Sequence, residues 1–270
     1  MVKIEILKEE DNMIQVLLSK TDRSFANALR RSLISDTPKM AIDSVRFQLG
    51  TKEQDDEIWE TTGPIPDEMV AQRLAMIPIP TVHDKFYFQD ECPNCKDLVE
   101  ADRGCLECQM IYTCVVFGTE EGRWVIAGDM KYLGEEALEI PDEFKSIPIT
   151  KLMKGQMIEF YATAIMGRGR DHTKWSPVCG VTFQPRRIGV LNNKTKAKIL
   201  WDMDLEISAK DFNKDGKLED VDKVAILTNE LNHVGEGTEE SRTFKDAISL
   251  EEVSGLSLIH ISEPTRRSTI

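Results

Sequence analysis

The segment between residues 21 and 38 constrains the fold most, because it encodes an amphipathic helix followed by a proline. At 100° per residue, one face carries apolar and small side chains, namely Phe25, Ala28, Leu29, Ser32 and Leu33. The opposite face carries Asn27, Arg30 and Arg31. Thr21 or Asp22 can cap the helix, and Pro38 requires that it end at or before Thr37. Periodicity alone fits an ordinary surface helix with solvated arginines, or a helix whose apolar stripe pairs with another chain.

Composition indicates a folded chain with one large domain or two ordinary ones. The chain has 270 residues, of which 41% are hydrophobic, so it can build a core. It carries 47 acidic and 34 basic residues, for a net charge of −13, and such a chain would repel a phosphate backbone. It has no run of 18 apolar residues, and its first residues lack the apolar core of a signal peptide. We therefore expect a cytoplasmic protein that binds neither nucleic acid directly nor a membrane.

The pattern of apolar residues along the chain predicts an α+β fold. Period-two alternation and β-branched or aromatic runs predict strands at residues 2–6, 13–18, 44–49, 111–117, 124–126 and 157–164. The first two are expected to form an antiparallel pair. A second helix is expected to end at Ile77, before Pro78.

Five of the six cysteines fall within 23 residues, and four of them form two C-x2-C pairs. These are Cys92, Cys95, Cys105 and Cys108. Each pair can present two thiolates from a tight turn, and two such turns provide the closed S4 site of structural zinc. Disulfides are the alternative, but the clustering and a reducing compartment argue against them. Thiols without a metal are the other alternative. We expect one Zn²⁺ in preference to it, with Cys114 and Cys179 buried as small apolar residues.

Residues 211–222 fit the calcium-loop pattern D-x-N-x-D-G-x5 followed by an acid. The candidate ligands are Asp211, Asn213, Asp215 and Asp222. Asp222 stands where a calcium loop usually has Glu, so bidentate contact is harder. The alternative is an Asx-rich turn that caps a helix at about 220–231. We favour that alternative because no second loop exists to pair with this one.

Three stretches resemble a known family, and they occur in its order. Asn27 to Arg31, followed by Pro38 and then residues 41–43, resembles the alpha motif of cellular RNA polymerases. Residues 66–78 resemble the second helix of that family, and residues 167–178 resemble a loop of its archaeal and eukaryotic members. The family comprises the bacterial alpha N-terminal domain, its archaeal counterpart (the D polypeptide of the archaeal polymerase) and the third-largest eukaryotic subunit. The resemblance covers roughly residues 1–185, and the archaeal form fits best.

This resemblance implies a discontinuous fold. Residues 1–45 and about 159–255 would form an alpha-like dimerisation subdomain. Residues 46–158 would form an inserted mixed α/β subdomain that carries the cysteine cluster at 92–114. Residues 256–270 do not continue the family pattern, and Pro264 would break a long helix there. We expect this last stretch to be a non-native tail.

The resemblance also implies a non-catalytic scaffold for assembly of a DNA-directed RNA polymerase, a nucleotidyltransferase whose Mg²⁺ triad lies in the largest subunit. We expect no catalytic residues in this chain. Its partners would be subunit L, the small subunits N and P, and the large catalytic subunits. The contacts with L would come from Phe25, Ala28, Leu29 and Leu33. The contacts with the large subunits would come from Asn27, Arg30 and Arg31.

Two other functions remain as alternatives. One is a stand-alone zinc-binding regulator of transcription, against which the net charge argues. The other is a redox-sensing polymerase subunit with an iron–sulfur cluster, as in many archaeal members. That chemistry requires C-x2-C-x2-C-x3-C-P or a close variant, and only Cys179 follows the Trp175 loop. The resemblance therefore does not transfer iron–sulfur binding to this chain.

Overall fold

The structure is a computed structural model that describes residues 2–10, 13–54, 57–198, 207–233 and 246–262. Contacts divide the chain into two compact units. The first contains Met1–Glu9, Ile14–Ala28 and Thr182–His260, and the second contains Glu10–Met13, Leu29–Val181 and Ile261–Ile270. Within the described residues, no helix is both long and apolar enough to cross a bilayer.

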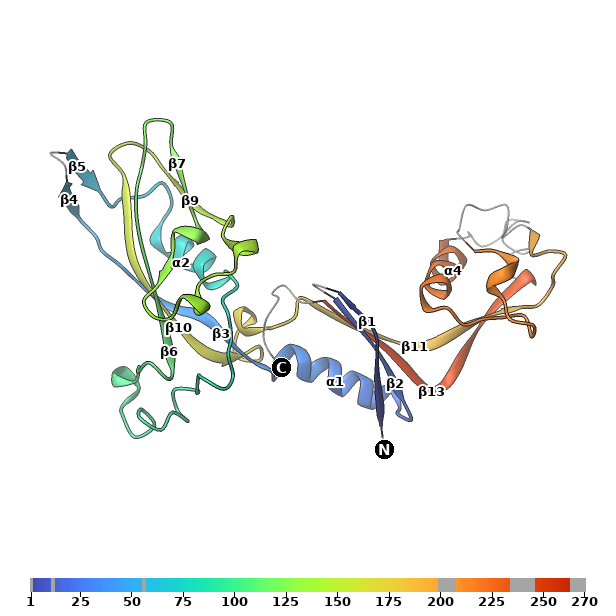
Figure 1. Cartoon of the computed structure of the whole chain (residues 1–270). Helices are drawn as coiled ribbons and strands as arrows, with labels where there is room; N and C mark the ends of the chain where they lie inside the picture. Colours follow the sequence, from blue (N-terminus) through green and yellow to red (C-terminus); the bar gives the residue numbers. More distant parts are fainter. Residues whose placement is uncertain (1, 11–12, 55–56, 199–206, 234–245, 263–270) are drawn as a thin grey trace. The chain divides into compact units, whose positions relative to one another are not determined.

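The first unit is built on a five-stranded sheet with the order β1-β2-β13-β11-β12 (Figure 1). Its strands are β1 (Lys3–Glu10), β2 (Met13–Ser19), β13 (Ile248–Ser262), β11 (Gly180–Leu191) and β12 (Lys217–Leu218). Helix α4 (Val221–His233) and the one-turn helix η6 (Ala209–Asp211) complete it. Its small core is formed by Ala197, Ile207, Leu218, Val224, Leu227 and Ile248.

Helix α1 spans Arg23–Ser35, and its ends follow the sequence pattern. The carboxylate of Asp22 accepts a hydrogen bond from the backbone N–H of Phe25 at 2.9 Å, which is the N-cap interaction. Arg23 forms an ion pair with Glu252 of β13 at 2.7 Å, so the first turn is attached to the sheet of the first unit. The helix ends before Thr37, as predicted from Pro38.

The second unit is built on an antiparallel sheet with the order β3-β10-β6-β8 (Figure 1). Its strands are β3 (Pro38–Phe47), β10 (Met157–Arg168), β6 (Gln109–Phe117) and β8 (Lys131–Tyr132). Two further pairs are β4 (Thr51–Gln54) with β5 (Glu57–Glu60), and β7 (Arg123–Ile126) with β9 (Pro148–Leu152). Helix α2 (Asp67–Ala75) packs against β3 and β9. One-turn helices are η1 (Glu100–Asp102), η2 (Ala127–Asp129), η3 (Glu136–Leu138), η4 (Asp142–Phe144) and η5 (Thr173–Trp175).

Alternation along the strands creates the core of the second unit. Strand β6 buries every second residue, namely Met110, Tyr112, Cys114 and Val116. Phe160, Ala162 and Ala164 of β10 are buried beside them. The hydroxyl of Tyr112 donates to the carbonyl of Leu138 at 2.8 Å, which satisfies the largest polar group in this core.

The structure differs from the sequence expectations in where β3 begins. This strand begins at Pro38 rather than Ser44, because Met40 and Ile42 are buried and pair with β10. Residues 38–47, 157–168 and 109–117 therefore share one sheet. Along the chain, the compact units alternate at 9/10, 13/14, 28/29, 181/182 and 260/261. Strand β13 also continues through residues 256–262, and residues 263–270 lie outside the described part.

Candidate metal centre and assembly surfaces

The two C-x2-C pairs form two turns with the same hydrogen-bond pattern. The carbonyl of Cys92 accepts from the N–H groups of Cys95 and Lys96 at 3.1 and 2.9 Å. The carbonyl of Cys105 accepts from the N–H groups of Cys108 and Gln109, both at 3.1 Å. The backbone N–H of Cys105 also donates to the sulfur of Cys108 at 3.2 Å. Each turn directs two sulfurs to the same point.

The four sulfur atoms lie at the spacing of a tetrahedral metal site. The Sγ of Cys105 is 3.5 Å from that of Cys92 and 3.6 Å from that of Cys108, and the Cys108–Cys95 distance is 3.8 Å. Four thiolates about 2.3 Å from one ion would be about 3.8 Å apart. A disulfide would require about 2.05 Å. Within the described part of the chain, these cysteines form the group of His, Cys, Asp and Glu side chains that could share a metal ion.

The surroundings of the cluster shift the pKa values of its thiols. Cys92 and Cys108 are fully buried, and burial raises the pKa of both thiols, that of Cys108 to about 12. Burial also acts to raise the pKa of Cys105. Hydrogen bonds from the backbone of Glu107 and from the other thiols outweigh burial and lower that pKa to about 7. Buried thiolates without a counter-charge are costly, so the arrangement suits a divalent ion bound by all four sulfurs.

The two remaining cysteines behave differently from each other. Cys114 is buried within β6, as predicted, and burial raises its pKa to about 12. Cys179 is exposed at the residue before β11, so the expectation that it is buried is wrong. The residues around Cys179, such as Val178, show no regular apolar pattern, so the exposure of Cys179 could not be predicted from the sequence.

Asp211, one of the four candidate calcium residues, is occupied by contacts within the chain. One oxygen of Asp211 contacts the ammonium of Lys223 at 2.5 Å, and the other accepts from the backbone N–H and hydroxyl of Ser208. These contacts lower the pKa of Asp211 to about 2, with the Lys223 hydrogen bond contributing most. Asp220 accepts from two N–H groups in the first turn of α4 and caps that helix.

Among the described residues, the carboxylates of Asp211, Asp215 and Asp222 do not gather with one another into a metal-binding group. Asn213 instead takes part in a turn. Its N–H donates to the carbonyl of Lys217, and its own carbonyl accepts from Gly216, which has a φ of +71°.

The predicted assembly helix exposes part of its apolar stripe. Phe25 is 41% exposed and Ala28 is also exposed, whereas Leu29 and Leu33 are half-buried. Ala26, which lies outside the predicted stripe, is the fully buried residue of α1. On the helical wheel, Ala26 lies about 100° from Phe25, and Leu33 lies close to Ala26. The buried side of the helix therefore includes part of Leu33, whereas Phe25 points outward. On the other side, Arg31 is exposed, whereas Asn27 and Arg30 are half-buried.

The loop at 167–178 is locked to the end of α1 and to β3. The N–H of Arg170 donates to the carbonyl of Ser35 at 3.0 Å. Lys174 contacts Asp43 of β3 at 2.6 Å, and its ammonium lies 4.3 Å from the centre of the Trp175 ring. The indole N–H of Trp175 donates to the carbonyl of Ile165 at 3.1 Å. The loop and β3 lie far apart in the sequence. The opposite charges of Lys174 and Asp43 are the sequence feature that fits their contact.

Comparison with known proteins identifies a matching family. Residues 15–246 match the family described as the RNA polymerase Rpb3/Rpb11 dimerisation domain. A DNA-directed RNA polymerase subunit Rpo3 from Picrophilus torridus is 35% identical over 185 residues, which is 68% of this chain and 64% of that protein. Rpo3 from Pyrococcus horikoshii is 35% identical over 68% of this chain and 59% of its own length. DNA-directed RNA polymerase II subunit rpb3 from Dictyostelium discoideum is 34% identical over 70% of this chain and 60% of its own.

The chain therefore belongs to the Rpb3/Rpb11 dimerisation family of RNA polymerase subunits. The matched segments cover 59–64% of the length of these three relatives. The family resemblance predicted from the three sequence stretches is confirmed.

Gly169 tests the contact between the loop and α1. A Cβ added at Gly169 would lie 2.1 Å from the carbonyl oxygen of Ile34, and that backbone atom cannot move away as a side-chain tip could. We expect Gly169→Ala to lower the free energy of unfolding by about 1–3 kcal/mol. Hydrogen exchange should become faster in the last turn of α1. Gly180→Ala is the matched control, because its added Cβ meets nothing within 4 Å. Equal stability of the two variants would contradict this account.

Proposed function

We propose that this chain is a non-catalytic assembly subunit of a DNA-directed RNA polymerase. The observation that carries the proposal is the match of residues 15–246 to a dimerisation domain. Helix α1 lies within that match and exposes Phe25 and Ala28. Exposed apolar residues in a row on a helix are well suited to pack against another chain.

The partner of this stripe is, in our proposal, a smaller alpha-like subunit, called L in archaea. Phe25, Ala28, Leu29 and Leu33 would pack against the equivalent helix of L. The half-exposed state of Leu29 and Leu33 supports this role, since a partner would complete their burial. The exposed area of Phe25 would contribute most, because aromatic side chains bury the largest apolar surface.

The large catalytic subunits would dock on the other side of α1, through Asn27, Arg30 and Arg31. Arginine suits this role because its planar guanidinium can bind a carboxylate through two parallel hydrogen bonds. Arg31 is exposed and can make such contacts as it stands. Small subunits N and P would join the same platform.

We further propose that the four-cysteine cluster holds one structural Zn²⁺. Four soft thiolates leave no coordination position for water, so the ion would not take part in catalysis. In the chain, the cluster joins the turn at 92–96 to the start of β6, where Gln109 pairs with Ile165 of β10. The metal would thus hold the loop at 92–108 to the sheet of the second unit.

The alternatives have less support. An iron–sulfur centre would need a Cys ligand set of the ferredoxin type, and the cluster instead consists of two separate C-x2-C turns. A stand-alone regulator that binds DNA would need a basic surface, whereas the chain has a net charge of −13.

The pairing proposal predicts the effect of a charge at Phe25. We expect Phe25→Asp to abolish complex formation with L, because the carboxylate would be buried unpaired in the interface. The isolated chain should keep its fold, since Phe25 is exposed and an acid in the first turn favours a helix. Co-expression and size-exclusion chromatography measure pairing, and circular dichroism checks the fold. A Phe25→Asp chain that still elutes with L would exclude this face as the interface.

The docking proposal makes a separate prediction for Arg31. Arg31→Glu should leave the complex with L intact, because this side chain lies on the face opposite Phe25. It should weaken capture of the large subunits by at least about tenfold, since charge repulsion replaces a charge-assisted hydrogen bond. A pull-down of the large subunits with the preformed pair measures the effect. Loss of L with retention of the large subunits would reverse the two assignments.

The zinc proposal is tested by metal analysis of the purified chain. We expect about one zinc ion per chain and a loss of nearly all of it in Cys108→Ser, whose sulfur contacts two other cluster sulfurs. Cys179→Ser should keep the metal, because Cys179 is exposed and lies outside the cluster. Iron together with acid-labile sulfide would refute the zinc assignment.

A further inference from the structure

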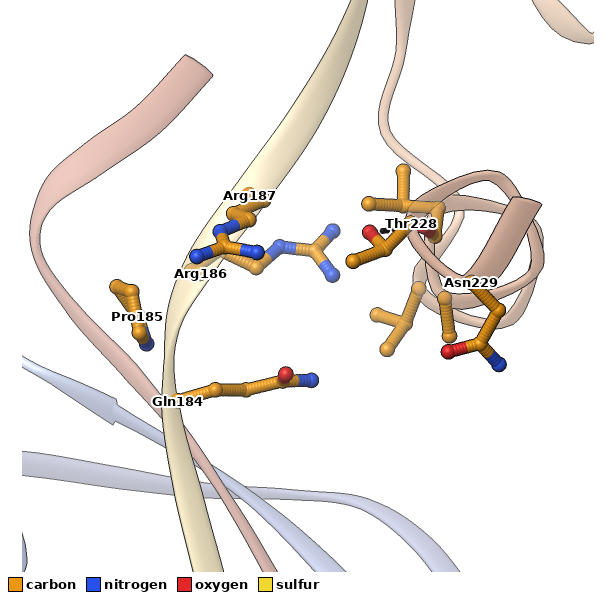
Figure 2. Close-up of a pocket in the computed structure, with 9 residues that line it drawn as sticks. Gln184, Pro185, Arg186, Arg187, Thr228 and Asn229 are labelled. Atoms are coloured by element: carbon orange, nitrogen blue, oxygen red, sulfur yellow. Dashed lines mark hydrogen bonds between the residues drawn. The ribbon is translucent and has the colours of Figure 1, made fainter. Parts of the chain in front are cut away.

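A small pocket lies within the first unit, between β11 and α4. Its volume is about 110 Å³. Figure 2 shows Gln184 and Arg186 extending from the strand toward the helix, Thr228 on the facing side of the helix, and Asn229 below it in this view. Residues 184 and 186 share a face because successive side chains of a strand alternate. The pocket is therefore lined by polar groups from both elements.

The pocket concentrates positive charge in an acidic protein. Among the described residues, its lining includes Arg186 and Arg187 and no Asp or Glu, although the chain as a whole carries −13. Arg187 extends away from Arg186 and lies 3.6 Å from a carboxylate oxygen of Glu252, too far for a hydrogen bond. Glu252 is closer to Arg23, at 2.7 Å. Arg187 is therefore only loosely neutralised.

Arg186 keeps hydrogen-bonding capacity for a ligand. Among the described residues, its hydrogen-bond acceptor is the backbone carbonyl of Glu219. A guanidinium has five N–H donors, so most of them are not used by this bond. Burial lowers the pKa of Arg186, while the charges of Glu219 and Asp220 oppose that effect. An anion in the pocket would offset the cost of this burial.

The other donors are side-chain amides. The amide groups of Gln184 and Asn229 lie on exposed residues at the pocket, and each has an NH₂ group. The hydroxyl of Thr228 donates to the carbonyl of Val224 at 2.7 Å, so its proton is already used in a hydrogen bond. The pocket thus offers one guanidinium and two amides as donors.

We propose that this pocket binds a small oxyanion, either a phosphoryl or a carboxylate group, on Arg186 with help from Gln184 and Asn229. A volume of about 110 Å³ is enough to hold one such group. The bidentate geometry of a guanidinium suits both kinds of group. This function is additional to assembly, and it uses residues outside α1 and outside the cysteine cluster.

Titration of the full chain with inorganic phosphate and with acetate tests the proposal. Both titrations are done by calorimetry at constant ionic strength, with chloride as the reference anion. Tighter binding of phosphate would identify a phosphoryl ligand, and tighter binding of acetate would identify a carboxylate. Binding of both no stronger than that of chloride would overturn the proposal.

The decisive variant is Asn229→Asp, which replaces a donor by a negative charge of the same shape on an exposed residue. We expect it to weaken binding of the preferred anion at least about tenfold. Gln72→Glu adds the same charge at an exposed position of α2 and should bind the anion as the unmodified chain does. Unchanged binding in Asn229→Asp, with the fold intact by circular dichroism, would show that the anion binds elsewhere and overturn the proposal.

Discussion

The pairing of β10 with two strands from distant parts of the sequence is the constraint on which the second unit depends. Strand β10 pairs with β3 from Phe160 to Arg168 and with β6 from Met157 to Ile165. A shift of one residue would turn Phe160 and Ala162 out of the core. It would also move the carbonyl of Ile165 away from the indole of Trp175. The register of one strand therefore sets both the core and the loop at 167–178.

The same register positions the candidate metal centre. Cys108 is adjacent to the first residue of β6, and Gln109 is paired with Ile165. A metal bound by the four sulfurs would fix the approach to β6, and the sheet would fix one of the two cysteine turns in return. Such mutual support would order a loop of small turns and exposed residues beside the sheet.

Local patterns in the sequence predicted the elements well but not their neighbours. Pro38 correctly predicted the end of α1, and alternation predicted β6, β7 and β10. The start of β3 was missed because Lys39 and Ala41 are buried on one face while Met40 and Ile42 are buried on the other, which removes period two. In β1 the alternating sequence predicted a strand correctly, yet every residue of that strand is exposed.

The candidate sites also differ in whether they depend on local sequence or on contacts between distant segments. The convergence of the four sulfurs was predictable because ligand spacing within a turn is a local property. The Lys174–Asp43 ion pair and the pocket at Arg186 each depend on a contact between segments far apart in the chain. In the pocket, Gln184 and Arg186 are two residues apart, but the donor at Asn229 comes from a helix more than 40 residues later. Such a pocket forms only when β11 and α4 pack together, so no motif in the sequence could predict it.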